Sequence, residues 1–341
     1  MDEQRYEGTT ARMEGQRSAE DRVLVLFIAG TGRSGSTLLS NILGQVDGLW
    51  SVGELRHFWQ RGIIENWRCG CGLSFDQCSI WSQIIDEAFD TGGIDAHAVV
   101  RAERRLMRVR HIPLVLLSRH RPELIDRRMG DYRSMLDRLY RSVRSVTGAQ
   151  VIVDSSKTPT YGYVLKTIPS IDLRVVHLVR DPRAAAYSLS RRRPRNDAGD
   201  ERSMDVMGPA KSSALWGTWN GLAEMLLSDE TGGYRRIRYE DLVRDVRGSI
   251  ISALDLVGRA DADLPFLRLD SVQLRPTHSV SGNPVRMRHG QIDVRPDVEW
   301  ASRMTEGDRA IATAVASPVM WRYGYPLSGR TRRSSPGRGS A

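Results

Sequence analysis

A glycine-rich segment near the start of the chain, FIAGTGRSGSTLL at residues 27–39, constrains the fold more than any other feature. An apolar run leads into it and an apolar helical pattern follows, which predicts a turn from a strand into a helix. Gly30 and Gly35 have the spacing of the phosphate-binding loop G-x-x-x-x-G-K-[ST], but Ser36 stands where that motif has lysine. The basic residue of the segment is Arg33, so the loop predicts an anion site that takes its positive charge from an arginine.

Such a turn binds an oxyanion because its backbone N–H groups and the start of the helix point at one spot. Glycines allow a close approach and hydroxyls add donors, and the predicted contacts are Gly32, Arg33, Ser34, Gly35, Ser36 and Thr37. In nucleoside triphosphatases the missing lysine reaches the β- and γ-phosphates, and the next residue holds Mg²⁺. Moving the cation to Arg33 implies a different geometry around the terminal group, although Asp154 after the apolar run 151–153 keeps a kinase using ATP and Mg²⁺ as an alternative.

Short apolar runs alternate with helical patterns along the chain. The predicted strands span residues 23–29, 151–153, 173–179 and 235–239. A helix signal follows each strand: Asp181 is a predicted N-cap ahead of Pro182, and Asp241 precedes a further apolar helical pattern. This alternation predicts an α/β fold in which helices cover both faces of a central parallel sheet.

One domain is predicted over residues 21–327, with an arginine-rich helical insertion at about 82–148. Residues 1–20 and 328–341 are polar and lack periodicity, so both ends are predicted to be disordered. No apolar stretch approaches the roughly 18–20 residues that span a bilayer. The leader also lacks the cleavage site of a signal peptide. We therefore expect a cytoplasmic protein that does not span a membrane.

The net charge of +9 suits an anionic ligand and equally suits nucleic acid. Aromatic residues make up 7% of the chain and are not interleaved with the arginine-rich runs at 101–110 and 191–195. The stacking platforms of single-strand binders are therefore not evident. No nucleic-acid partner is predicted, and a non-catalytic basic binding module stays an alternative to an enzyme.

All three cysteines, Cys69, Cys71 and Cys78, fall in the segment RCGCGLSFDQC. Structural zinc sites take four ligands, usually with C-x2-C spacing, so this pattern is a poor match, even with His57 as a fourth ligand. The spacing favours free or locally packed thiols, with a disulfide or a metal as alternatives. No metal site is predicted.

Three segments resemble the sulfotransferases that use 3′-phosphoadenosine 5′-phosphosulfate (PAPS). GTGRSGSTLL is similar to their 5′-phosphosulfate loop, and VVHLVRDPRAAAYSLSRRR resembles their 3′-phosphate motif, with Arg180 and Ser188 as its anion contacts. YRRIRYEDLVRD resembles a later signature, and the match runs from about residue 23 to 325. The resemblance implies a P-loop NTPase-like three-layer fold, PAPS as co-substrate, an acceptor hydroxyl and no required metal.

PAPS carries two separate anionic groups, so its binder needs two anion sites in one pocket. Parallel strands open their loops on one edge of the sheet, which brings Arg33 and Arg180 within reach of one nucleotide. The segment HSVSGNPVRMRHG resembles the late loop that covers the 3′-phosphate in sulfotransferases, which implies that Arg286 and Arg288 contact it.

The resemblance also implies catalytic residues. Lys157, ahead of Pro159, is similar to the lysine that contacts the sulfuryl bridge in tyrosylprotein sulfotransferases. The resemblance implies that Lys157 acts on that bridge together with Arg33. Glu54 in VGEL is similar to the catalytic glutamate of the same enzymes, and His57 is the alternative base. The chain lacks the K-T-H segment that supplies the histidine of cytosolic small-molecule sulfotransferases. Sugar, lipid-linked, phenolic and peptide hydroxyls are all compatible acceptors.

Overall fold

The computed structural model describes residues 22–89, 94–106, 115–117, 123–192, 194–195, 197–198, 203–228 and 232–327. The predicted disordered ends, 1–20 and 328–341, lie outside these ranges, as do parts of the predicted helical insertion. Among the described residues, no helix combines the length and the apolar character that crossing a membrane requires.

A five-stranded sheet with the strand order β2-β3-β1-β4-β5 forms the centre of the molecule, and all of its neighbouring strands run parallel. The strands are β1 (Val23–Gly30), β2 (Leu49–Gly53), β3 (Val151–Lys157), β4 (Ile171–Val179) and β5 (Tyr234–Arg238). This confirms the predicted parallel sheet. The third strand continues to Lys157, beyond the predicted end at residue 153, through an irregularity in its pairing with β1.

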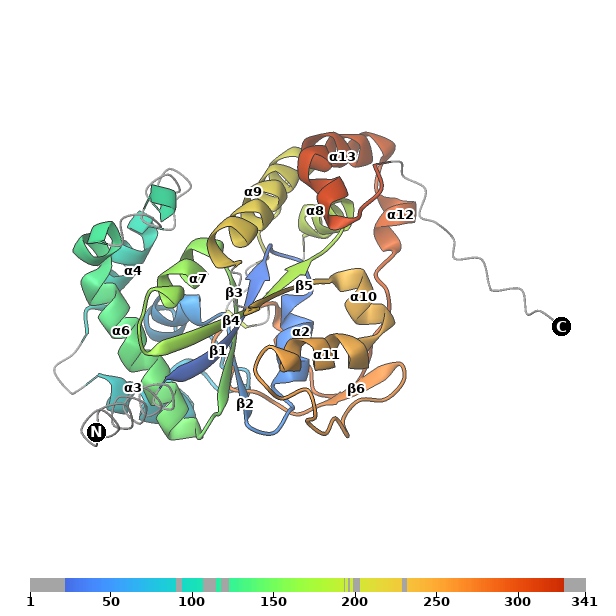
Figure 1. The fold of residues 1–341 in the computed structure, drawn as a ribbon. Helices are drawn as coiled ribbons and strands as arrows, with labels where there is room; N and C mark the ends of the chain where they lie inside the picture. The colour runs from blue at the N-terminus through green and yellow to red at the C-terminus, as the bar shows by residue number, and fades with distance from the viewer. Residues whose placement is uncertain are drawn as a thin grey trace, which may run out of the picture.

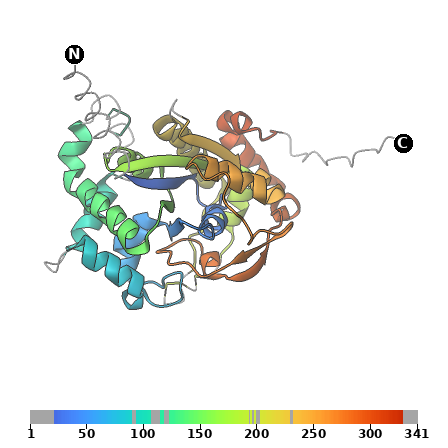
Figure 2. The same ribbon diagram turned by 60° about the horizontal axis from the view of Figure 1, so that its bottom comes forward.

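Alternate residues of the buried strands enter two different cores, which explains why their sequences are apolar almost throughout. Val25 and Phe27 of β1 pack into one core, whereas Leu26 and Ile28 pack into the other. The fold class is therefore the predicted α/β class with three layers, and Figures 1 and 2 show the sheet between its helices.

The first core is covered by five helices (Figure 1): α3 (Ser79–Ala88), α4 (Ala96–Leu106), α6 (Glu123–Thr147), α7 (Pro159–Lys166) and α9 (Pro209–Leu227). The second core is covered by α2 (Ser36–Leu43), α10 (Tyr239–Arg244) and α11 (Val246–Asp255), together with the hairpin of β6 (Ser271–Leu274) and β7 (Gly290–Asp293). Near the end of β4 lie α8 (Pro182–Ser190), α12 (Glu299–Arg303) and α13 (Glu306–Met320).

Two helix starts follow from local capping. The Asp181 carboxylate accepts a hydrogen bond from the Arg183 backbone, as expected of the N-cap of α8. The helical pattern after β5 begins at Tyr239, before the expected start at Asp241, and it is broken at Asp245. The Asp245 carboxylate accepts from Gly248 N–H at 2.8 Å, so it caps a second helix where one helix was expected.

Candidate functional site

The candidate site lies along the edge of the sheet where the parallel strands end. Glu54 follows β2, Lys157 ends β3, the glycine-rich loop follows β1 and Arg180 follows β4. The pairing of Ala29 with Lys157 places the lysine beside the start of the loop. Because neighbouring strands end together, four segments far apart in the sequence converge at one edge.

The glycine-rich loop has the backbone of an anion-binding turn. Gly35 adopts a left-handed φ of 94° as the N-cap of α2, and a side chain there would come within 2.5 Å of the Tyr239 ring. Arg33 also has a left-handed φ, 69°, which is rare for a residue with a side chain and concentrates at functional sites. The Ser34 hydroxyl is buried and has no hydrogen-bond partner among the described residues. A buried hydroxyl without a partner fits an oxyanion in the turn.

Glu54 and Lys157 form an ion pair in which Oε1 and Nζ lie 2.5 Å apart, and both side chains are about 15% exposed. The backbone holds both residues in place: Glu54 N–H donates to Ser281 O at 2.9 Å, and Lys157 Nζ donates to Ser155 O at 3.2 Å. Lys157 has a left-handed φ of 65°, like Arg33. The pair is therefore a fixed acid and base at the mouth of the loop.

Burial and neighbouring charges set the protonation of this pair. Burial acts to raise the pKa of Glu54, but the charges of Lys157 and Arg61 outweigh it, and the pKa lies below its ordinary value. Burial lowers the pKa of Lys157, while the Glu54 carboxylate opposes that change. Glu54 is therefore ionised at neutral pH, and Lys157 releases its proton more readily than an exposed lysine does.

His57 touches the same carboxylate, with its Nε2 3.5 Å from Glu54 Oε2 and 3.0 Å from Arg56 Nη2. Burial, reinforced by the charges of Arg56 and Arg61, holds the pKa of His57 well below its ordinary value. The imidazole is consequently neutral at neutral pH. Arginine can only donate, so the neutral ring accepts the Arg56 hydrogen bond at Nε2, the nitrogen that lies nearest Glu54.

Arg180 is pressed against the glycine-rich loop. Its Nη1 donates to Arg33 O at 3.0 Å, its Nη2 pairs with Asp297 at 2.8 Å, and its guanidinium lies 4.5 Å from the centre of the Tyr239 ring. Trp216 on α9 fixes its backbone, since the indole donates to Arg180 O at 2.9 Å. Arg180 is thus a nearly buried cation whose carboxylate partner, Asp297, is 36% exposed.

The segment after His278 lies over the glycine-rich loop, and its two arginines, Arg286 and Arg288, differ in burial. Asn283 N–H donates to the Thr37 hydroxyl at 3.4 Å, which joins this segment to the start of α2. Arg286 is buried and donates to Ser279 O at 2.7 Å, to Arg68 O at 2.5 Å and to Asp197 at 3.4 Å. Arg288 is exposed. Within the described part of the chain, no hydrogen bond or ion pair joins either arginine to Arg180.

The remaining predicted loop contacts divide by burial. Ser36 is buried at the start of α2, while Gly32 is exposed. Ser188 is buried in α8, one helix away from the loop. Sequence reasoning missed Tyr239, Ser281 and Asp297, because each acts through a neighbour that is distant in the sequence and no local pattern marks it.

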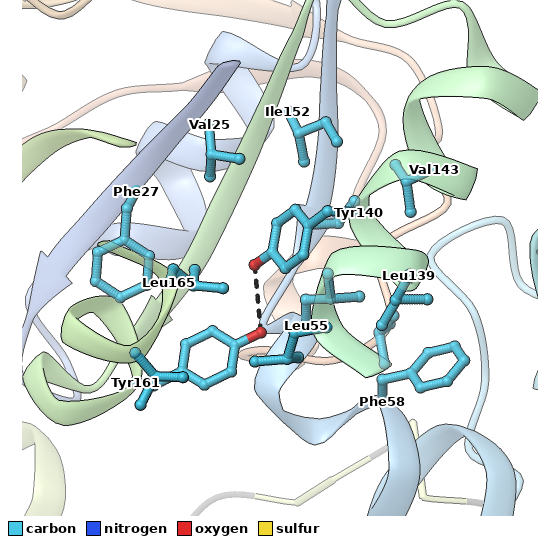
Figure 3. Packing of buried hydrophobic residues seen from close by; sticks show 14 of the residues in the cluster. Val25, Phe27, Leu55, Phe58, Leu139, Tyr140, Val143, Ile152, Tyr161 and Leu165 are labelled. Carbon is cyan, nitrogen blue, oxygen red and sulfur yellow. Dashed lines mark hydrogen bonds between the residues drawn. The ribbon is translucent and has the colours of Figure 1, made fainter. Parts of the chain in front are cut away.

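Asp154, which the kinase alternative requires as a Mg²⁺ ligand, faces the first core. Its carboxylate accepts from Tyr140 OH at 2.5 Å and from Ser156 N–H at 2.7 Å, and Figure 3 shows Tyr140 beside Tyr161 between the sheet and α6. Helix α2 packs in the second core, against the opposite face of the sheet. The structure therefore makes Asp154 part of the core.

A polar cavity of about 340 Å³ opens beside His57. Its lining includes four arginines and three acidic residues: Arg56, Arg61, Arg104, Arg195, Glu65, Glu103 and Asp205. Arg61 and Arg195 lie against the same indole, Trp67, at 4.6 Å and 4.3 Å from its ring centre. The cavity therefore suits a polar molecule, and its lining includes His57, which contacts Glu54.

Several solved structures are similar to this chain at low identity. A sulfotransferase domain from the Synechococcus PCC 7002 olefin synthase is 19% identical with a TM-score of 0.46, over 90% of this chain and 96% of that chain. A sulfotransferase domain from the curacin biosynthetic pathway is 18% identical with a TM-score of 0.44, over 90% and 99%. A sulfotransferase from Alicyclobacillus acidocaldarius is 14% identical with a TM-score of 0.40, over 88% and 94%. No curated protein matches the chain.

A model of one protein family matches most of the chain. The model of the sulfotransferase family matches residues 26–263, a range that contains the glycine-rich loop, Glu54, Lys157 and Arg180. Since this range is more than half of the chain, the protein belongs to the sulfotransferase family.

Proposed function

We propose that this sulfotransferase takes its sulfuryl group from PAPS and transfers it in line to an acceptor hydroxyl. The observation that carries the proposal is the 2.5 Å ion pair between Glu54 and Lys157 at the mouth of the glycine-rich loop. It places a proton acceptor and a cation next to a turn that is built for an anion. Sulfuryl transfer needs both, because positioning and electrostatic stabilisation dominate transfers of this kind.

The chain would hold the phosphosulfate mainly through the loop. Backbone N–H groups at residues 32–37 and the partnerless Ser34 hydroxyl supply hydrogen bonds, and Arg33 supplies charge. Lys157 extends toward the same spot from the neighbouring strand. We assign Lys157 and Arg33 to the oxygen that bridges sulfur and phosphorus, where negative charge accumulates as the bond breaks.

Glu54 is the proposed general base. The acceptor oxygen attacks sulfur while its proton passes to the Glu54 carboxylate, and the sulfur–oxygen bond to the phosphate breaks with its electron pair. The products are the sulfated acceptor and adenosine 3′,5′-bisphosphate. Lys157 lowers the pKa of Glu54 in the free protein; an anion next to Lys157 offsets that charge and makes the carboxylate a better base.

Arg180 is the proposed contact of the 3′-phosphate. In the structure its charge is balanced by Asp297, which is the more exposed member of the pair. A phosphate would replace Asp297 as the partner of Arg180, so the carboxylate competes with the nucleotide. Ser188 and Arg288 stay predictions for the same phosphate, and Arg286 is proposed to support the segment that carries Ser279.

The acceptor is proposed to be a polar hydroxyl compound, such as a sugar, bound in the cavity beside His57. That cavity is lined by side chains of both charges, and one of its lining residues, His57, contacts Glu54. The lining side chains already pair with one another, as Arg56 does with Glu103 at 3.0 Å, and their remaining N–H groups and carboxylate oxygens offer hydrogen bonds to a molecule with several hydroxyls.

The donor proposal is tested by thermal-shift measurements with adenosine 3′,5′-bisphosphate, AMP, and ATP with Mg²⁺. A ligand at 100 times its Kd adds roughly 2.7 kcal/mol to the free energy of unfolding. We expect the bisphosphate to stabilise the protein most, with or without EDTA. Arg180→Gln should reduce the stabilisation by the bisphosphate to that by AMP. Asp297→Asn should lower the Kd for the bisphosphate about tenfold, which corresponds to about 1.4 kcal/mol of binding free energy.

Stabilisation by ATP with Mg²⁺ alone would contradict the proposal and favour the kinase. An Asp297→Asn variant that binds the bisphosphate as the unchanged protein does would instead show that Arg180 does not meet the 3′-phosphate.

A further inference from the structure

The three cysteines of the chain gather with a histidine from a distant segment. One ligand atom each from Cys69, Cys71, Cys78 and His278 lies within 4.8 Å of the other three. The Nδ1 atom of His278 is 3.2 Å from the Cys78 sulfur and 3.9 Å from the Cys69 sulfur. The cysteines form no disulfide. The sequence spacing did not reveal this group, because His278 lies 200 residues beyond Cys78. The histidine considered as a fourth ligand, His57, lies beside Glu54 instead.

We propose that these four side chains bind one structural zinc ion. Three thiolates and one imidazole are a common ligand set of structural zinc, and zinc–sulfur bonds of about 2.3 Å in a tetrahedron separate the ligand atoms by about 3.8 Å. The observed separations need only small side-chain adjustments to reach that value. Four protein ligands complete the coordination and leave no position for a substrate, so the ion would act on the fold and not on the reaction. Soft thiolates favour zinc over Mg²⁺ or Ca²⁺.

The backbone around the first two cysteines brings both sulfurs to one side. Gly72 N–H donates to Cys69 O at 2.9 Å and Cys69 N–H donates to Leu73 O at 2.8 Å, which closes a tight turn. Gly70 between them runs along the segment that contains His278, where a side chain would come within 2.4 Å of Thr277 O. A glycine is required at this position because the two backbones touch.

His278 is oriented as a ligand by its neighbours. Its ring stacks on Trp50 with centres 5.6 Å apart and planes 7° apart, and its carbonyl accepts from the Trp81 indole at 2.7 Å. Trp81 belongs to α3, which begins directly after Cys78, so one helix positions two members of the group.

The ion would join two segments that support the candidate site. The loop at 69–78 and the segment at 278 meet at the metal, and two residues after His278, Val280 N–H donates to Val52 O at 2.9 Å. The next carbonyl, Ser281 O, accepts from Glu54 N–H. Binding of zinc would therefore hold the segment whose Ser281 carbonyl accepts from Glu54 N–H.

The first experiment measures metal in the full-length protein purified without chelators from zinc-supplemented medium. We expect about one zinc per chain, a fall in Tm when a strong zinc chelator removes it, and recovery of Tm when zinc is returned. Replacement by cobalt should give the visible absorption of a tetrahedral ion with sulfur ligands. These measurements use no donor or acceptor, so their outcome is independent of the proposed sulfuryl transfer.

Variants then identify the ligands. Cys78→Ser and His278→Ala should reduce the zinc content, while His289→Ala, which changes an exposed histidine outside the group, should leave it unchanged. If the two ligand variants do not fold, the measurements on the unchanged protein decide the question alone. Protein with no bound zinc, zinc content unaffected by either ligand variant, or two of the three thiols blocked as a disulfide before reduction would each overturn the proposal.

Discussion

At the scale of single residues, the site depends on a carboxylate placed between a lysine and a histidine. Lys157 and His57 both contact Glu54, but they differ in what they do to it. Lys157 supplies a positive charge that keeps the carboxylate ionised, whereas burial and the neighbouring arginines keep His57 neutral. Both groups are therefore in the form that accepts a proton, and the assignment of Glu54 as the base is a proposal that variants must test.

Replacement of Glu54 tests this assignment. Glu54→Gln should lower kcat by ~10²- to 10⁴-fold, the usual contribution of a general base, with the Kd for adenosine 3′,5′-bisphosphate unchanged. His57→Asn is the matched variant and should lower kcat much less. The measurement is release of the bisphosphate from PAPS with a polar acceptor found by screening. A larger loss in His57→Asn than in Glu54→Gln would identify the histidine as the base.

At the scale of elements, the ends of neighbouring strands bring the reactive groups together. The extension of β3 to Lys157 is the clearest case, because its pairing with β1 shifts register between Phe27 and Ala29. That irregularity adds length to β3 and turns its last residue toward the loop. In the same way, α2 starts where Gly35 allows the chain to pass Tyr239 at the end of β5.

The contact between Gly35, the N-cap of α2, and Tyr239, the first residue of α10, gives a prediction at this scale. Gly35→Ala should destabilise the protein by more than about 1 kcal/mol, because an alanine at a left-handed φ is strained and its side chain would also meet the Tyr239 ring. Gly32→Ala is the control, since its side chain would meet open space. Thermal unfolding of both variants checks this. Equal Tm values would show that the loop adjusts freely at Gly35.

The sequence predicted the strands well and the contacts between distant segments poorly. Strands such as residues 23–29 were recognised because burial on both faces makes them apolar throughout. The end of β3 was missed because its last residues, DSSK, are polar. The partners of Arg286 and the histidine that faces Cys78 were missed for another reason: each is far away in the sequence, and only the folded chain brings them together.

At the scale of the whole molecule, two buried titratable groups in the sheet have opposite effects on how the free energy of unfolding depends on pH. Burial raises the pKa of Asp154 in β3 to about 6, and burial lowers the pKa of His177 in β4 to about 4. The two ring nitrogens of His177 have partners in the core, Tyr234 OH at 2.5 Å from Nδ1 and Asn220 Oδ1 at 2.8 Å from Nε2, and the bond to Asn220 opposes the effect of burial. Because the two groups titrate in nearly the same pH range, their effects on the stability of the domain largely cancel.

The sign for each group follows from its pKa in the unfolded chain. Between its unfolded value of 3.8 and about 6, folded Asp154 binds more protons, so its contribution to stability is complete at low pH and is lost as pH rises through about 6. Between about 4 and its unfolded value of 6.5, unfolded His177 binds more protons, so its contribution is complete at high pH and is lost as pH falls through about 4.

Single replacements should expose each effect. Asp154→Asn should lower the free energy of unfolding, relative to the unchanged protein, by about 3 kcal/mol more at about pH 4 than at about pH 7. His177→Gln should lower it by about 3 kcal/mol less at about pH 4 than at about pH 7. Denaturant unfolding at both pH values measures the difference. Parallel pH profiles for both variants and the unchanged protein would show that neither group titrates on unfolding.

The bond from Glu54 N–H to Ser281 O has a consequence for the order in which the enzyme is made. All five strands of the central sheet are synthesised before residue 239, but the segment at 278–282 leaves the ribosome much later. The backbone support of Glu54 is therefore made only after the residues that form the sheet, the glycine-rich loop and Lys157. If Glu54 is the base, catalytic competence would arrive as a late event of biosynthesis.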